Sequence, residues 1–280
     1  MIERAPAKVN LCLYVGPTRA DGRHELVTAF DSVSVFDELE IAEAATDEVV
    51  CKEVAGPNLV ADALAGLRGA GWGAPSVRVV IRKRIPVAAG MGGGSADAAA
   101  MLRCAPRLAP VADRVLERIA AELGADVPSQ LHPGPSLGTG AGEILAPLHG
   151  LAPYGTLVLP QQFPLATRDV YREADRLGLA RPGRELGQLA AQLAERLPDR
   201  LVNDLQPAAL SLAPQIGAVI ARARAAGADD AIVCGSGPTV IGVFRGADGE
   251  RRAQRAVAEL GEGFSAAPIR AGVGDSAPND

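Results

Sequence analysis

The chain has 280 residues, of which 48% are hydrophobic and 22% are charged, and its formal net charge is −5. This balance is typical of a globular protein that buries a core in one or two domains. An acidic chain with one Trp, three Tyr and no block of Lys or Arg lacks the charge pattern of a nucleic-acid-binding protein. Its apolar runs are shorter than the roughly 20 residues that span a bilayer, so we expect neither nucleic acid nor membrane as a partner.

The four cysteines are dispersed along the chain and form no CxxC pair. This spacing favours reduced, mostly buried thiols over a disulfide framework or a zinc site. Lys8 and Asn10 interrupt the N-terminal segment where a signal peptide needs an unbroken apolar stretch. We therefore expect a cytoplasmic protein, either a monomer or a homodimer.

The first third of the chain has the pattern of β-strands. In Lys8–Gly16, apolar residues alternate with others at a period of two. His24–Ala44 is rich in Val, Phe and Ile and is interpreted as two strands that separate near Asp37. Ser76–Ile85 predicts a further strand, with Val and Ile on one face and Arg on the other. It leads directly into a glycine-rich loop and the start of an alanine-rich helix.

The middle of the chain predicts a helix and a hairpin. Val111–Leu123 has one apolar stripe at helical spacing, and Gly124 follows as a C-terminal cap. Pro135–Leu148 contains two short apolar segments around a Gly-rich turn, which is typical of a β-hairpin.

A dense run of Gly and Pro between His132 and Gly155 indicates a domain boundary. We place the two domains at residues 1–150 and 151–280, and we expect the α+β class. The second domain is predicted to contain a strand, three helices, two strands, a helix and a last strand. We assign the first three of these strands to Gly155–Leu159, Ala231–Cys234 and Val240–Phe244, and the last helix to Glu250–Leu260.

The loop PVAAGMGGGSADAA predicts a phosphate-binding site. Its glycines allow N–H groups to approach an anion closely, and Ser95 or a neighbour opens a helix whose N-terminus favours negative charge. A flexible linker is the alternative, but linkers do not usually join a strand directly to a helix. The Walker A motif requires a Lys after the glycines, and the Rossmann motif begins at the strand end, whereas Pro86–Ala89 intervene here.

This loop resembles the second motif of the GHMP kinases, PxxxGLGGGSSDAA, with Met91 in place of Leu and Ala96 in place of the second Ser. Pro6–Asn10 (PAKVN) resembles the first motif of that family, and Cys234–Val240 (CGSGPTV) resembles the third. The resemblance implies a two-domain fold, with an N-terminal domain like ribosomal protein S-five domain two and a ferredoxin-like C-terminal domain. It also implies that ATP is bound by Pro86, Val87, Ala88, Ala89, Gly90, Met91, Gly92, Gly93, Gly94, Ser95 and Ala96.

Further strings resemble one branch of the family, which phosphorylates the 2-hydroxyl of a cytidine diphosphate-linked methylerythritol in non-mevalonate isoprenoid biosynthesis. A GHMP kinase for another small alcohol, a catalytically weakened ligand sensor of the same fold and a Rossmann oxidoreductase are the alternatives. The strings are RADGRHEL, NLV after a proline (residues 58–60), LGADVP, LGTGAGE, PLATRDVY and LVNDLQPAA.

The resemblance makes Asp126 the catalytic base and pairs it with Lys8, whose charge would keep the carboxylate ionised. An Asp after a helix-ending Gly also serves as a capping residue, and an edge-strand Lys also points to solvent, so both alternatives stay open. Mg²⁺ is expected with ATP because it neutralises phosphate charge. Ser95 is its natural hydroxyl ligand, and no acidic metal ligand is assigned.

For the substrate, the resemblance implies a contact from His24. Asn10 lies two residues after Lys8 on the same face of the strand, where it would meet the substrate or Asp126, and Thr167 is a further candidate contact. His24 would hydrogen-bond cytosine, although it is also compatible with an ordinary surface position. The branch has Tyr before this histidine, and this chain has Arg23, whose guanidinium also stacks on flat rings. Phe163 is proposed as the opposite stacking face, with a place in the core as the alternative. Thr167 also suits a helix N-cap.

Overall fold

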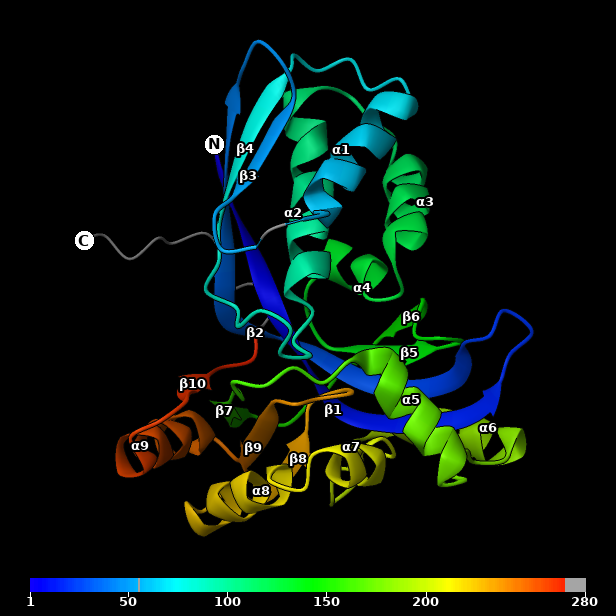
Figure 1. Cartoon of the computed structure of the whole chain (residues 1–280), viewed down its shortest axis with the longest axis vertical. Coiled ribbons are helices and arrows are strands. Elements are labelled where there is room, and N and C mark those ends of the chain that lie inside the picture. The colour runs from blue at the N-terminus through cyan, green and yellow to red at the C-terminus, as the bar shows by residue number, and fades with distance from the viewer. Residues whose placement is uncertain (55, 270–280) are drawn as a thin grey trace.

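The computed structural model describes residues 1–54 and 56–269, and the first half of the chain forms a six-stranded sheet (Figure 1). β1 and β2 pair antiparallel along almost their whole length, and the other edge of β2 is shared by β4 and β5. β3 pairs parallel with β4, and β6 pairs antiparallel with β5. The strands are β1 (Ile2–Thr18), β2 (His24–Glu43), β3 (Glu48–Cys51), β4 (Val77–Arg82), β5 (Ser136–Thr139) and β6 (Ile144–Pro147).

The strands predicted at β1 and β4 and the predicted hairpin β5–β6 are confirmed. The prediction of two strands in His24–Ala44 is wrong, because β2 runs unbroken through Asp37. Asp37 is fully buried, and its carboxylate accepts hydrogen bonds from the backbone N–H groups of Arg84 and Ile85. Asp37 can therefore lie within a buried strand, because donors from the segment after β4 satisfy its carboxylate.

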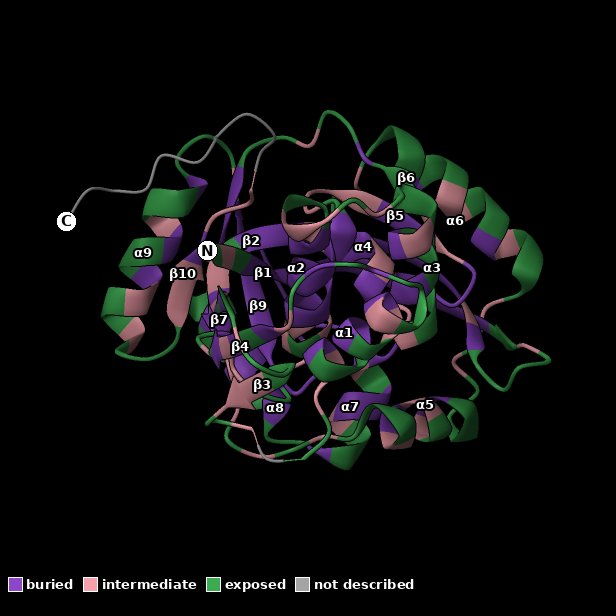
Figure 2. Ribbon diagram, turned by 90° about the horizontal axis from the view of Figure 1, so that it is seen from above, coloured by how far each residue is buried: buried purple, intermediate pink, exposed green. Residues whose placement is uncertain are grey.

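Both faces of β1 are buried, although a strand with alternating residues usually has one face in water. Helix α2 packs on this strand, and the C-terminal half covers it elsewhere, where Leu13 N–H donates to the carbonyl of Val202 at 2.8 Å. Figure 2 shows β1, β2 and α2 as the buried centre of the molecule. A polar group on β1 therefore lies inside the protein and needs a partner there.

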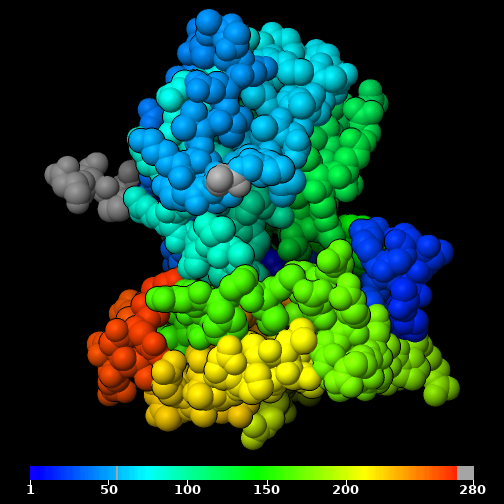
Figure 3. All heavy atoms as spheres, viewed as in Figure 1, coloured from blue at the N-terminus to red at the C-terminus, as the bar shows by residue number. Residues whose placement is uncertain are grey.

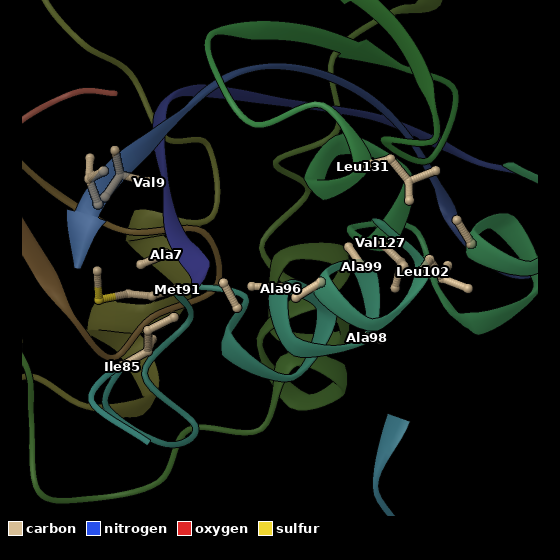
Figure 4. Packing of buried hydrophobic residues seen from close by; sticks show 14 of the residues in the cluster. Ala7, Val9, Ile85, Met91, Ala96, Ala98, Ala99, Leu102, Val127 and Leu131 are labelled. Atoms are coloured by element: carbon tan, nitrogen blue, oxygen red, sulfur yellow. The ribbon is translucent and has the colours of Figure 1, made fainter. Parts of the chain in front are cut away.

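Four helices lie on one side of this sheet (Figure 1). The helix after the glycine loop and the amphipathic helix are confirmed, whereas α1 and α4 were not predicted. Small side chains let α2 pack closely against its neighbours, and Figure 4 shows Ala96, Ala98, Ala99 and Leu102 of α2 in the same buried cluster as Val127. The helices are α1 (Leu59–Gly69), α2 (Gly93–Leu108), α3 (Asp113–Leu123) and α4 (Val127–Leu131).

The second half contains a four-stranded sheet in the order β10-β7-β9-β8, in which all three pairings are antiparallel. Counted along the chain this is the order fourth, first, third, second, as in a ferredoxin-like unit. Four helices separate β7 from β8, so the prediction of three is wrong. The elements are β7 (Tyr154–Leu159), α5 (Thr167–Arg176), α6 (Gly183–Glu195), α7 (Gln206–Leu212), α8 (Ile216–Ala225), β8 (Asp230–Val233), β9 (Val240–Arg245), α9 (Gly249–Leu260) and β10 (Phe264–Ala266).

The two sheets belong to two lobes that meet at a narrower middle (Figure 3). The α+β class is confirmed. Helix α6 belongs to the second half of the chain but packs against β1, β2 and β5 of the first sheet, with Leu186 and Leu193 in a shared core cluster. Within the described ranges, no helix is long and apolar enough to cross a membrane.

Candidate active site

The three sequence motifs meet at the junction of the lobes. A Cβ added at Gly90 would lie 2.8 Å from the carbonyl oxygen of Cys234, and one at Gly92 would lie 3.0 Å from Cγ of Lys8. One added at Gly235 would lie 3.1 Å from Oδ1 of Asn10. All three glycines have positive φ angles, which other residues rarely adopt. Glycine is therefore required where the motifs touch.

The glycine loop leads into the N-terminus of α2. The first intrahelical bond runs from Ala96 N–H to the Gly92 carbonyl, so the N–H groups of Gly93, Gly94 and Ser95 remain for an anion. The loop lines a cavity of about 310 Å³ together with residues of α1 and β3. Ala96 is the exception among the predicted loop residues. Its side chain is fully buried and its N–H is already bonded, so it lines neither this cavity nor the larger one beside it.

Lys8 and Asp126, predicted as a pair, lie together beside the loop. Nζ of Lys8 is 3.7 Å from Oδ2 of Asp126 and donates a hydrogen bond of 2.7 Å to Oδ1 of Asn10. Asn10 in turn donates to Oγ1 of Thr28 at 2.9 Å. The side chain of Lys8 is only 8% exposed, which excludes the alternative of an edge-strand lysine in solvent. Its charge is thus held in place on two sides, and its catalytic role stays a prediction.

Asp126 does not cap a helix, although it immediately precedes α4. Its side chain makes no capping hydrogen bond and remains 42% exposed. Pro128 stands in the first turn of α4, and Ser129 donates to the backbone carbonyl of Asp126 at 2.8 Å. The backbone is therefore fixed while the carboxylate stays accessible to a ligand beside Lys8.

A second cavity of about 720 Å³ begins at this pair and runs along β2. His24, Leu26, Thr28 and Phe30 all line it, as expected for residues spaced by two on one face of a strand. Gly90, Gly92 and Ser95 line it as well, so the two cavities share the glycine loop. The shared loop is where a phosphate donor and an acceptor would meet.

His24 lies at the far end of this cavity and is buried. Its ring stacks on Tyr171 of α5, with ring centroids 5.0 Å apart, and its Nε2 is 2.7 Å from Oδ1 of Asp175. Burial and the charge of Asp126 raise the pKa of Tyr171, so this phenol stays neutral. The surface alternative for His24 is excluded by its burial.

The structure does not place Phe163 in the cavity. This residue packs instead against the core cluster of the second sheet, and Tyr171 occupies the aromatic position beside His24. The sequence placed the aromatic residue before α5, whereas the side chain that faces the cavity lies one turn inside that helix. Arg23 does line the cavity, with its guanidinium bonded to the Asp21 carboxylate at 2.9 and 3.1 Å.

Thr167 is the first residue of α5 and not its N-cap. Its hydroxyl is 2.9 Å from that of Ser236 in the third motif, and both residues line the large cavity. Asn203, which the sequence analysis did not single out, supports the same motif. Its amide donates to the carbonyls of Val233 and Gly235 at 2.7 Å each. These bonds hold the backbone at the start of the third motif, where the Cys234 thiol lies 3.7 Å from the carbonyl oxygen of Gly90.

A buried charge cluster lies below the loop. Nζ of Lys83 donates to Oδ2 of Asp97 at 2.7 Å and also to Asp37, and both carboxylates are nearly or fully buried. Lys83 follows β4 and Asp97 lies in the second turn of α2, so the cluster ties together the two ends of the glycine loop. Burial raises the pKa of Asp97 from 3.8 to about 7, with the negative charge of Asp37 as a further cause.

Because the folded pKa of Asp97 is raised, the folded chain binds more protons than the unfolded chain between about pH 4 and pH 7, so stability is lost as the pH rises through that range. Asn at this position has no proton to lose. The wild type should therefore lose stability from pH 5 to pH 8 while Asp97→Asn does not. We expect the difference in the free energy of unfolding between variant and wild type to shift in favour of the variant by about 1 kcal/mol or more over that range, since one pKa unit corresponds to about 1.4 kcal/mol. Urea unfolding at both pH values measures this, and parallel pH profiles would contradict it.

Within residues 1–54 and 56–269, no group of three or more His, Cys, Asp or Glu side chains forms a metal site. Ser95 lines both cavities, and its hydroxyl is the group at the loop that fits a cation held between phosphates. All four cysteines are free, as predicted, although Cys51 is only half-buried.

Comparison with known proteins agrees with this geometry. The model of the GHMP kinases N terminal domain matches residues 58–134, and that of the GHMP kinases C terminal domain matches residues 176–265. A 4-diphosphocytidyl-2-C-methyl-D-erythritol kinase of Nocardioides sp. is 41% identical over 89% of this chain and 90% of its own. One of Salinispora tropica is 42% identical over 92% and 86%.

A solved structure has the same arrangement of both lobes. The crystal structure of a 4-(cytidine 5'-diphospho)-2C-methyl-D-erythritol kinase superposes with a TM-score of 0.79 at 35% identity, covering 96% of this chain and all of that one. The predicted two-domain fold is thereby confirmed, and the chain is a small-molecule kinase. It belongs to the GHMP kinase family and, within that family, to the 4-diphosphocytidyl-2-C-methyl-D-erythritol kinases.

Proposed function

We propose that this kinase transfers the γ-phosphoryl group of ATP to the 2-hydroxyl of 4-diphosphocytidyl-2-C-methyl-D-erythritol, a step of non-mevalonate isoprenoid biosynthesis. The observation that carries the proposal is the Lys8–Asp126 pair, 3.7 Å apart, at the junction of two cavities that share the glycine loop. The relatives named above support the choice of substrate.

Asp126 accepts the proton of the attacking hydroxyl. Its carboxylate is accessible and lies 3.7 Å from the Lys8 ammonium, whose positive charge attracts the substrate oxygen. The free N–H groups of Gly93, Gly94 and Ser95 stabilise the negative charge that develops on the transferred phosphoryl group. Mg²⁺, held by phosphate oxygens and the Ser95 hydroxyl, would supply further charge neutralisation.

The large cavity fits the length of the acceptor. Asn10 contacts both Lys8 and Thr28, and Thr28 lies four positions after His24 along β2, which corresponds to roughly 13 Å of strand. This distance suits a nucleoside diphosphate linked to a small polyol. The polyol would lie at Lys8 and Asp126, and the base would lie at His24 and Tyr171.

The remaining assignments belong to the same proposal. We assign residues 1–150 to the domain with the ATP loop and the catalytic pair, and residues 151–280 to the second domain. All strands of the first sheet end by Pro147 and those of the second begin at Tyr154, while residues 270–280 lie outside the described part. The cytoplasmic location and a monomeric or homodimeric state remain predictions.

A panel of phosphoryl acceptors tests the function. Purified protein with Mg²⁺ and ATP should phosphorylate the diphosphocytidyl substrate and leave homoserine and mevalonate unchanged. If the protein phosphorylates only another alcohol, the proposed substrate is wrong and that alcohol takes its place. Nucleotide and ligand binding without any turnover would favour a sensor of the same fold.

A further inference from the structure

Asp175 is a carboxylate that the proposed mechanism does not use, although it lines the large cavity. It lies in the last turn of α5, one turn after Tyr171, and its Oδ1 is 2.7 Å from Nε2 of His24. His24 stands 151 positions earlier at the start of β2, so the contact joins the two lobes. The carboxylate is half exposed, with 51% of its side chain accessible.

The hydrogen bond fixes which nitrogen of His24 carries a proton. An ionised carboxylate only accepts hydrogen bonds, so Nε2 must be the donor. The other polar neighbour of Nε2 is Oγ1 of Thr18, at 3.4 Å. Among the described residues, Nδ1 of His24 has no hydrogen-bond partner, so Nδ1 is the nitrogen left for a ligand.

The ring is also held in its plane. Tyr171 stacks on it at an interplanar angle of 27°, and only 7% of the His24 side chain is exposed. A flip of the imidazole would place Cε1 at Asp175 and break the hydrogen bond that Nε2 makes there. The stack and the carboxylate together therefore present one nitrogen, in one protonation pattern, to the cavity.

We propose that Asp175 is a positioning residue that makes His24 select cytosine over uracil, an inference that rests on the proposed function. In the neutral ring Nδ1 carries a lone pair and accepts a hydrogen bond from the 4-amino group of cytosine. Uracil has a carbonyl oxygen at that position, so two acceptors would face each other. A site built around one hydrogen bond rejects the analogue that lacks the donor.

The test compares the diphosphocytidyl substrate with its uridine analogue. In Asp175→Ala, Nδ1 is free to become the protonated nitrogen, and we expect the ratio of kcat/KM values to fall by about tenfold, which is the effect of one hydrogen bond. Most of the loss should appear in KM for the cytidyl substrate, with kcat and KM for ATP nearly unchanged. Asp175→Asn should restore the ratio, because its amide oxygen still accepts from Nε2.

Asp199→Ala removes an exposed carboxylate that does not line the cavity and serves as the matched control. An unchanged base preference in Asp175→Ala would overturn the inference, as would a preference that Asp175→Asn fails to restore. If Asp175→Ala lowers kcat and thermal stability and raises the KM values of both substrates together, the role of Asp175 is only structural. If the wild type itself does not turn over the cytidyl substrate, the proposed function fails and this inference fails with it, whereas an unchanged base preference in Asp175→Ala overturns the inference alone.

Discussion

Asp126→Asn is expected to lower kcat by about 10²-fold or more while leaving ATP affinity nearly unchanged, because a positioned base acts only in the transition state. The amide has the same shape as the carboxylate, so the contact with Lys8 and the backbone around Ser129 should persist. It has no basicity at neutral pH and cannot accept the proton. Steady-state kinetics with the cytidyl substrate, together with calorimetric titration of ATP, separates the two effects.

The matched control is Asp113→Asn, which makes the same change at an exposed position in the first turn of α3. It should retain wild-type kinetics. Lys8→Met should also lower kcat, and the double variant should lose little more than the worse single variant, because residues that act as a unit are not additive. A kcat for Asp126→Asn within about threefold of the wild type would remove Asp126 from the chemistry.

The meeting of the three motifs could be predicted from the sequence because each contains residues with few structural alternatives. Glycines in a tight turn indicate close contacts, and Gly90 and Gly92 of the loop and Gly235 of the third motif make them. A lysine such as Lys8 within an apolar strand indicates a buried partner. The local pattern thus indicates that Lys8 has a buried partner, and the resemblance to the GHMP kinases identifies that partner as Asp126.

The base end of the cavity could not be predicted in this way. The pairing of His24 with Asp175 joins residues 151 positions apart, and no local pattern marks such a contact. Phe163 and Tyr171 are both plausible aromatic partners in the sequence, and only the start of α5 at Thr167 decides which one faces His24. Helix boundaries are set by tertiary packing, so this choice required the structure.

The wrong prediction of two strands around Asp37 also results from contacts with residues distant in the sequence. Periodicity treats a charged residue in an apolar run as a break, whereas here it anchors Lys83 and the backbone of Arg84 and Ile85. The sequence interpretation used the glycine loop itself but assigned no role to the charges below it. Those charges lead to the largest stability effect expected for this chain.

Lys83→Met is expected to lower the free energy of unfolding by about 3–5 kcal/mol, because it leaves the buried carboxylates of Asp37 and Asp97 without their cation. Lys52→Met is the matched control. Lys52 is exposed and makes no ion pair within the described ranges, so its replacement should change stability by less than about 0.5 kcal/mol. Urea unfolding of both variants at pH 8, without nucleotide, measures the difference.

The cause of that loss is itself testable. If uncompensated charge is responsible, Asp97 can relieve it by taking up a proton, and the loss caused by Lys83→Met should be smaller at pH 5 than at pH 8. Adding Asp97→Asn to Lys83→Met removes one of the two charges and should restore part of the stability at pH 8. A loss that is equal at both pH values and persists in the double variant would show that the lysine stabilises the loop by packing of its aliphatic stem. In that case the charges of Asp37 and Asp97 would not be what holds the two ends of the glycine loop together.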